Sequence, residues 1–195
     1  MSATTSPTLA PPGAGLPWPE LMIARGLFAL RCRTGNTESF THRFIEEREK
    51  IRQLLHSLDD AALSTRVLIK RPPGLEDSSR DWSVLMTLDH LRIVHGEFIR
   101  VIESLTNETI PAGKASTAAV KPDPQVTADV IPRYETSCEK LLASLSSVRN
   151  FKTRTKFPHP WFGPMDAHAW LALAGGHMAI HRVQIDRIRQ GLTSA

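Results

Sequence analysis

The chain has 195 residues, of which 41% are hydrophobic and 23% are charged, and its net charge is +4 at pH 7. This composition is typical of one soluble globular domain. Lys and Arg are interleaved with Asp and Glu along the chain, so the charge does not indicate a nucleic-acid-binding surface. No apolar run reaches the roughly 18 to 20 residues that a membrane span needs, so we expect no membrane anchor either.

The two cysteines, Cys32 and Cys138, lie far apart in the sequence and outside any CxxC motif. This arrangement favours a reducing compartment and predicts no disulfide framework. Neither cysteine has a neighbour in the sequence that would activate it, so we expect no catalytic thiol. The N-terminus lacks the basic start and the hydrophobic stretch of a secretory signal, and we therefore expect a cytoplasmic protein.

Residues 1–19 are rich in Pro, Ser, Thr, Ala and Gly. This composition predicts a disordered N-terminal tail, followed by a single domain over residues 20–195. A short amphipathic helix should open the domain at about residues 20–32, because Gly35 and Asn36 would break it.

Two long helices are predicted next. The first covers about residues 37–58, and Thr37 is a good N-cap because its hydroxyl can accept a bond from a free backbone N–H group. The second begins near Trp82 or Ser83 and ends near Leu105. Its apolar residues form two stripes rather than one, which indicates a central position in a bundle.

Residues 106–125 contain four prolines or glycines, and a connection of this length usually crosses over or is mobile. A further helix covers about residues 127–147, and it begins later if Pro132 lies in its first turn. The last helix covers about residues 165–190 and should end at Gly191. No segment alternates convincingly as a strand. The sequence thus predicts an all-α fold, a four-helix bundle with a long crossover connection plus a short N-terminal helix.

Near the C-terminus, His177 and His181 are four residues apart in the helical pattern GGHMAIHRVQIDRI. Four residues turn a helix by about 400°, so both imidazoles leave the same face and can reach one metal ion. The alternative is that both are ordinary helix residues. Gly175 and Gly176 each cost about 1 kcal/mol relative to Ala, which suggests a close approach or room for a ligand, with a plain kink as the alternative. Gln184 could accept the outer N–H of His181, or could be a simple surface residue.

A third ligand could come from the predicted helix that ends near residue 105, which carries His90 and His95. Helical periodicity does not choose between the two, because each falls on one of the two apolar stripes. At least one of them is therefore an ordinary core or surface histidine.

The other histidines have simpler interpretations. His159, in the proline-rich loop KFPHPWFGPM, is interpreted as structural, with a contact to substrate as the alternative. His168 lies about 180° from His177 on the helix and is a poor ligand. His42 and His56 are expected at the surface of the first long helix.

Several motifs together resemble the DinB-like superfamily of metal-binding four-helix bundles. They are WSVLMTLDHL from Trp82 to Leu91, HPWFG from His159 to Gly163, Trp170, and HMAIHRVQIDRI from His177 to Ile188. The resemblance covers about residues 36–192, which is most of the chain. Members pair one histidine on the second helix with two histidines four residues apart on the last helix. The resemblance therefore implies His90, His177 and His181 as metal ligands, and it favours His90 over His95.

The same resemblance implies a divalent metal ion, with nickel and zinc as the first candidates, and commonly a homodimer. Some relatives resemble thiol-dependent transferases or isomerases that use a low-molecular-weight thiol. The resemblance implies no DNA-binding surface, in agreement with the scattered charge.

The function expected from these residues is that of a divalent-metal-dependent enzyme acting on a small molecule. An ion held by three histidines lowers the pKa of a thiol or a water molecule in its open position, which suits an S-transferase or a hydrolase. Asp89 and Glu97 are candidate general bases, but neither has a clear position beside the histidines. The alternative is a non-catalytic bundle that binds a metal or a small ligand. Association with nucleic acid or with a membrane is a third interpretation, which the scattered charge disfavours.

Overall fold

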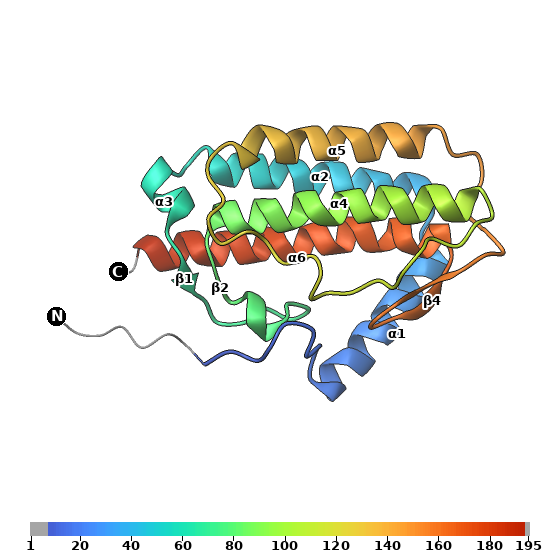
Figure 1. Cartoon of the computed structure of the whole chain (residues 1–195), viewed down its shortest axis with the longest axis horizontal. Helices are drawn as coiled ribbons and strands as arrows, with labels where there is room; N and C mark the ends of the chain where they lie inside the picture. The colour runs from blue at the N-terminus through green and yellow to red at the C-terminus, as the bar shows by residue number, and fades with distance from the viewer. Residues whose placement is uncertain (1–7, 194–195) are drawn as a thin grey trace.

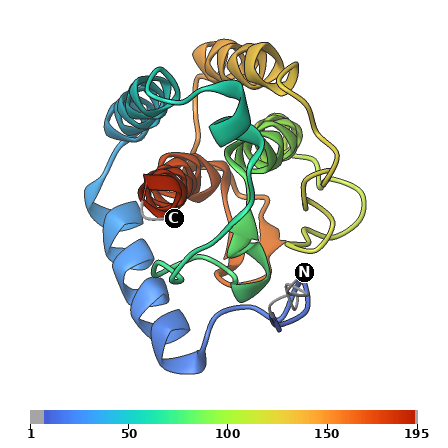
Figure 2. The same cartoon turned by 90° about the vertical axis from the view of Figure 1, so that its left-hand side faces the viewer.

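The computed structural model describes residues 8–193 and shows a bundle of four long helices (Figure 1). These helices lie side by side, and Figure 2 views the bundle from one end. They are α2 (Thr37–Leu55), α4 (Val84–Thr106), α5 (Val130–Ser146) and α6 (Ala167–Thr193). A further helix, α1 (Trp18–Thr34), lies at an angle to the bundle and contacts α6. The predicted all-α four-helix bundle with an N-terminal helix is confirmed.

Helix α4 has a central position in the bundle, as its two apolar stripes predict, and α6 has one as well. Helix α4 packs against α5 and α6, and α6 packs against α2 and α4. Every residue from Trp82 to Leu91 is buried. The core holds fully buried side chains from all four helices, among them Phe40, Phe44, Leu88, Leu91, Tyr134 and Leu171. Because each large apolar side chain contributes roughly 1.5–3 kcal/mol when buried, this core is the main source of stability.

Two helix ends differ from the expectation. Asn36, rather than Thr37, is the N-cap of α2, and its side chain accepts a hydrogen bond from the backbone N–H of Ser39 at 2.8 Å. At the other end of the chain, α6 continues past Gly191 instead of stopping there. A Cβ atom at Gly191 would lie 2.6 Å from the side chain of Val67. This glycine therefore allows a close approach and does not end the helix.

The long connection between α4 and α5 covers residues 107–129 and contains no helix or strand. It ends where α5 begins at Val130, which is later than residue 127 because Pro132 occupies the first turn. This crossover connection was predicted, and its course brings Val120 and Lys121 towards α4 and the start of that helix.

Short elements in the connections differ from the expectation that no strand is present. They are too short to show an alternating pattern, since each strand has only two or three residues. Strand β1 (Val67–Leu68) pairs antiparallel with β2 (Asp81–Trp82), and β3 (Phe157–His159) pairs antiparallel with β4 (Gly163–Met165). The remaining short elements are the helix α3 (Asp60–Ser64) and a single 3-10 turn (Asp77–Ser79).

The N-terminal stretch differs from the expected disordered tail over the part that the structure describes. Residues 8–17 form no helix or strand, but they contact the rest of the domain. The backbone N–H of Ala10 donates to the carboxylate of Asp77 at 2.8 Å, and Leu16 is buried. Helix α1 then begins at Trp18, and residues 1–7 of the predicted tail lie outside the described residues.

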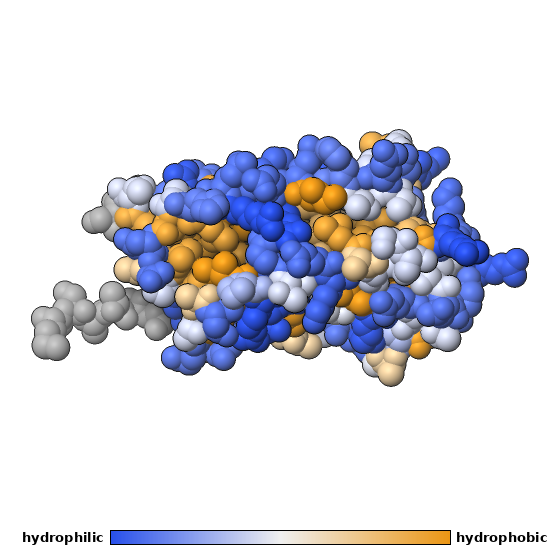
Figure 3. Space-filling model, turned by 90° about the horizontal axis from the view of Figure 1, so that it is seen from above, coloured by the Kyte–Doolittle hydropathy of each residue, from blue (hydrophilic) through white to orange (hydrophobic). Residues whose placement is uncertain are grey.

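The surface over α5 is mainly hydrophilic, with hydrophobic areas between the polar side chains (Figure 3). This pattern agrees with the interleaving of charged residues in the sequence. None of the helices described over residues 8–193 combines the length and the apolar character that crossing a bilayer requires.

Candidate metal centre

Three histidine side chains from two helices meet at one point inside the bundle. His90 extends from α4, and His177 and His181 extend from α6, one turn apart. The Nε2 atom of His177 lies 3.2 Å from Nε2 of His90 and 3.2 Å from Nε2 of His181. We call these residues the histidine trio. All three ligand atoms lie within 4.8 Å of one another, so the trio could hold a metal ion.

Hydrogen bonds to the outer ring nitrogens orient two of the three rings. The carbonyl oxygen of Val120 can only accept, so Nδ1 of His90 donates to it at 2.6 Å. The amide nitrogen of Gln184 donates to the carbonyl of Ser79 at 2.7 Å, which leaves its oxygen to accept from Nδ1 of His181 at 2.7 Å. Both rings therefore carry their proton on Nδ1 and present a lone pair at Nε2.

This arrangement of lone pairs fits a cation. The Nε2 atoms of His90 and His181 both face Nε2 of His177, which carries at most one proton and can donate it to only one of them. A divalent ion would satisfy all three nitrogens together. Tetrahedral Zn–N bonds of 2.0–2.1 Å place ligand nitrogens about 3.3 Å apart, close to the two 3.2 Å separations that involve His177. Nδ1 of His177 is buried and has no protein partner among the described residues.

Burial keeps the imidazoles of the trio neutral. It lowers the pKa of His90 to about 4, and it lowers the pKa of His177 and of His181 well below the ordinary value for histidine. The positive charge of Lys121 acts in the same direction on the pKa of His90 and of His181. Because a metal binds the unprotonated nitrogen, these rings are in the ligand form at neutral pH.

Aromatic side chains surround the trio. The ring of Trp82 lies parallel to that of His181, with an interplanar angle of 6° and centroids 6.3 Å apart. The same indole lies 5.2 Å from the ring of His90, centroid to centroid. On the other side, Phe98 meets His177 edge to face at 6.0 Å. These contacts restrict how the imidazoles can turn.

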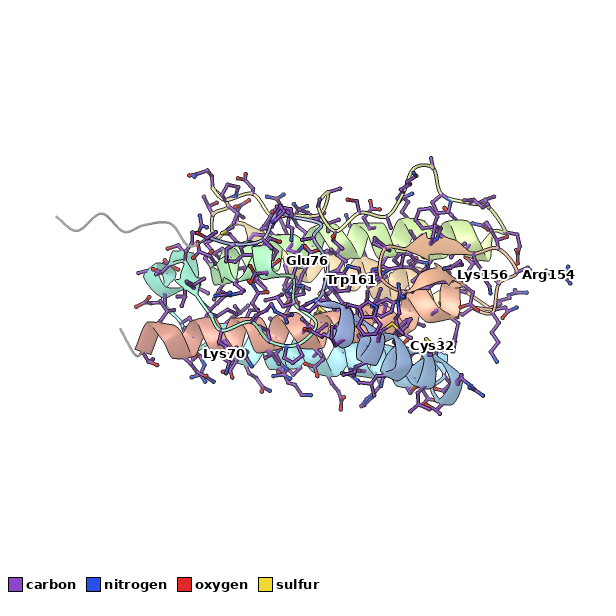
Figure 4. The ribbon with its side chains drawn as sticks, turned by 90° about the horizontal axis from the view of Figure 1, so that it is seen from below. Cys32, Lys70, Glu76, Arg154, Lys156 and Trp161 are labelled. Carbon is purple, nitrogen blue, oxygen red and sulfur yellow. The ribbon has the colours of Figure 1, made fainter. Side chains whose placement is uncertain are left out.

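A cavity of about 140 Å³ opens beside the trio. Its walls come from α4, α6, the connection between β1 and β2, the connection 107–129 and the hairpin of β3 and β4, and all three histidines line it. Figure 4 views this side of the molecule and shows Trp161 of the hairpin close to α1 and to Glu76. A small molecule in this cavity would lie beside the trio, which suits an open coordination position.

The two candidate general bases are both engaged in ion pairs. Asp89 is buried, pairs with Arg92 at 2.8 Å and accepts from the backbone N–H of Asp123 at 3.0 Å. Glu97 lines the cavity and pairs with Arg100 at 2.6 Å. Both oxygens of Asp89 are therefore engaged, whereas the ion pair of Glu97 uses Oε2 alone.

The structure separates His95 from the trio. Its Nδ1 atom lies 2.9 Å from the hydroxyl of Ser137, and its ring contacts Phe44 and Tyr134. Burial lowers the pKa of His95 to about 3. His95 is thus a core histidine between α4, α5 and α2, and His90 is the residue of α4 that meets α6.

The other histidines lie where the sequence places them, with one addition. His42 and His56 are exposed on or next to α2. His168 is buried away from the trio, and its Nε2 lies 3.1 Å from the carbonyl of Cys32. His159 lines the cavity as well as forming the hairpin, and burial lowers its pKa to about 4.

The two glycines before His177 have different surroundings. A Cβ atom at Gly175 would lie 3.3 Å from the backbone of Phe40 and Phe44, so this glycine lets α2 approach α6 closely. A Cβ atom at Gly176 would meet nothing within 4 Å. Close approach therefore explains one glycine, and nothing in the structure explains the other.

Sequence reasoning missed two groups that shape the site. The carbonyl of Val120 orients His90, but a main-chain atom leaves no signal in a side-chain pattern. Lys121 pairs with Glu76 at 2.7 Å and lies over the ring of Trp82 at 5.4 Å. These partners are far apart in the chain, and no local spacing could have joined them.

Comparisons with known proteins agree with this fold. In structure, the chain is similar to the crystal structure of TT2238, a four-helix bundle protein, with a TM-score of 0.55 and 20% identity over 82% of this chain and 100% of that chain. No curated protein gives a significant sequence match. A sequence profile of the DinB superfamily matches residues 42–185, which include the whole histidine trio. Because that match spans well over half of the residues of this chain, the chain belongs to the DinB superfamily.

Proposed function

We propose that this protein is a divalent-metal-dependent enzyme in which His90, His177 and His181 hold the ion, with nickel or zinc as the metal. The observation that carries the proposal is the meeting of three Nε2 atoms. In His90 and His181, a hydrogen bond from Nδ1 orients the ring so that Nε2 faces this point. A bound divalent ion would lower the pKa of a thiol or of water in its open position. An S-transferase that uses a low-molecular-weight thiol and a hydrolase both fit this chemistry.

The cysteines of the chain support an external thiol rather than an internal one. Burial raises the pKa of Cys32 to about 11 and that of Cys138 to about 12. Both thiols therefore stay protonated at neutral pH and are poor nucleophiles. In the transferase version, the nucleophilic sulfur comes from a small molecule that enters the cavity.

A second candidate function is a non-catalytic bundle that binds a metal or a small ligand. The observation that favours it is the engagement of Asp89 and Glu97 in ion pairs, which ties each carboxylate to an arginine rather than to a substrate. Coordination decides between the two functions: a fourth protein ligand indicates a structural ion, and an exchangeable water indicates catalytic potential. X-ray absorption of the nickel-loaded or zinc-loaded protein would distinguish them.

The proposal is tested by metal analysis of protein purified without a histidine tag. The wild type should hold one nickel or zinc ion per chain, and His177→Ala should hold none. His56→Ala, at an exposed histidine outside the trio, serves as the matched control and should keep the ion. Unchanged metal content in the His177→Ala variant would reject the site. A screen of small thiols with electrophiles then tests the transferase chemistry.

We further propose that the protein is a cytoplasmic homodimer without nucleic-acid or membrane partners. Support for a reducing compartment comes from the cysteines, which are both unpaired. Support for a dimer comes from large apolar side chains exposed along α1, namely Trp18, Met22, Ile23, Leu27 and Leu30. Patches of this kind often form subunit contacts. Light scattering should give twice the chain mass for the wild type and for Leu68→Glu, and the monomer mass for Leu27→Glu; a monomeric wild type would contradict the proposal.

A further inference from the structure

We infer that the cavity beside the histidine trio takes a compact apolar ligand, uncharged apart from the one donor atom that it offers to the trio. Only the donor atom rests on the proposed function, because that atom would bind the metal ion held by the trio. The apolar character follows from the cavity walls, from the pairing of the charges that line it and from the N-terminal residues that support it.

The walls of the cavity are mainly aromatic and aliphatic. They include Val94 and Phe98 of α4, Trp170 and Leu173 of α6, and Trp161 and Phe162 of the hairpin. The cavity has a volume of about 140 Å³. In another protein, an apolar cavity of about 150 Å³ stays dry and binds benzene. One aromatic ring, or a branched aliphatic group of that size, therefore fits this space.

Each charged side chain that lines the cavity already has a counter-ion. Glu97 pairs with Arg100 at 2.6 Å, and Glu76 pairs with Lys121 at 2.7 Å. Thr117 donates to the other carboxylate oxygen of Glu76 at 2.8 Å. A charged ligand body would find no unpaired partner among the described lining residues. Burying it there would be strongly unfavourable.

Residues outside the superfamily match support the aromatic wall. Phe28 of α1 packs on Phe162, with ring centroids 4.4 Å apart, and Nε of Arg25 donates to the carbonyl of Trp161 at 2.6 Å. The backbone at Gly15 also approaches the indole of Trp161, since a Cβ there would lie 3.7 Å from its Nε1. The matched region is 42–185, so this N-terminal support is a feature of this chain beyond that region.

His159 offers the ligand one polar contact. Its Nδ1 accepts a hydrogen bond from the backbone N–H of Trp161 at 3.1 Å, so the neutral ring carries its proton on Nε2. No described residue accepts from that Nε2–H. The ring is held between Phe162, at 5.1 Å, and Trp170, at 5.5 Å, centroid to centroid. An oxygen atom on an otherwise apolar ligand can therefore bind here.

The ligand class is tested on the metal-free full chain with a neutral and an anionic probe. Fluorobenzene and para-fluorobenzenesulfonate are titrated and followed by fluorine NMR, and the neutral para-fluorobenzenesulfonamide, which has the size of the sulfonate, separates the effect of charge from that of size. Fluorobenzene should bind at least about tenfold more tightly, because the sulfonate would be buried unpaired. Equal or tighter binding of the sulfonate would overturn the inference.

The supporting role of the N-terminal residues is tested with Phe28→Ala. Loss of the ring behind Phe162 should weaken fluorobenzene binding by about three- to tenfold. Ile45→Ala, at an exposed apolar position on α2, is the matched control and should bind as the wild type does. If Phe28→Ala does not fold, Arg25→Ala removes the hydrogen bond to Trp161 instead. Wild-type affinity in the folded variant contradicts the role.

Uptake of zinc and of nickel is measured on the same protein after the metal is added back, so that the two proposals can fail separately. A chain that binds fluorobenzene but no zinc or nickel keeps the apolar cavity and loses the proposed enzyme. A chain that binds the ion but excludes fluorobenzene keeps the metal site and overturns the ligand class.

Discussion

His90 and His95 lie five residues apart on α4, and both are buried with a strongly lowered pKa, about 4 and about 3. Their partners nevertheless differ. His90 donates to the carbonyl of Val120 and turns Nε2 towards two other histidines beside a cavity. His95 lies against Ser137 and Cys138, and its Nε2 is buried without a protein partner among the described residues. Burial and a lowered pKa therefore do not identify a ligand; converging nitrogens beside a cavity do.

The helix itself explains why the two neighbourhoods differ. Five residues turn an α-helix by about 500°, so the two side chains leave it about 140° apart. A helix in the centre of a bundle has a different neighbour in each direction. His90 therefore meets α6, whereas His95 meets α5 and Phe44 of α2.

The largest effect is expected when His90 or His95 is replaced by glutamine in separate variants. His90→Gln removes a ligand and should abolish binding of nickel or zinc. His95→Gln should keep the ion and lose about 1–3 kcal/mol of unfolding free energy, because it changes a buried polar group. Metal analysis and chemical denaturation of both variants check this. Loss of the ion from a folded His95→Gln protein would break the comparison.

A smaller effect is expected from the partner of His181. Gln184→Leu removes the acceptor of its Nδ1–H and should weaken metal affinity about 10- to 100-fold without removing a ligand. Competition with a chromophoric chelator measures the change. Gln53→Leu, at an exposed position on α2, is the control. If Gln184→Leu binds the metal as tightly as the wild type does, this hydrogen bond does not orient the ligand.

The effect that is smallest at neutral pH comes from the titration of His95. The pKa of His95 is about 3 in the fold and near 6.5 in the unfolded chain, so the unfolded chain takes up this proton first as the pH falls. His95 therefore lowers the unfolding free energy between about pH 6.5 and pH 3, by up to about 1.4 kcal/mol per pH unit. In metal-free protein, His95→Phe should flatten the pH profile in this window. Measurements at pH 8, where the ring is neutral in both states, separate any packing change. An unchanged slope would show that His95 does not remain neutral in the fold.

Most of the fold could be predicted from the sequence, because long helices repeat their pattern many times. Helix α4 shows this best, since its stripes predicted both its extent and its central position. The strands of two or three residues could not be predicted, because alternation needs more residues than they have. Gly191 misled the prediction because it resembles a helix terminator, whereas its contact with Val67 is tertiary.

The candidate site was predictable only in part. The spacing of His177 and His181 placed both rings on one helical face, since that relation is local. The choice of His90 over His95 needed the resemblance to a superfamily, because helical phase gives a direction but not the neighbour found there. The contacts of Phe28 and Arg25 with the cavity wall could not be predicted, because they join the N-terminal helix to a distant hairpin. That helix also lies outside the part of the chain that the resemblance covers.

The indole of Trp82, which is parallel to the ring of His181 and tilted against that of His90, gives the protein an intrinsic fluorescent reporter. An open-shell ion such as nickel would quench its emission at this range, whereas closed-shell zinc would leave the emission largely intact. Nickel occupancy could then be followed in unlabelled protein as a loss of Trp82 emission, against the emission of the other three tryptophans.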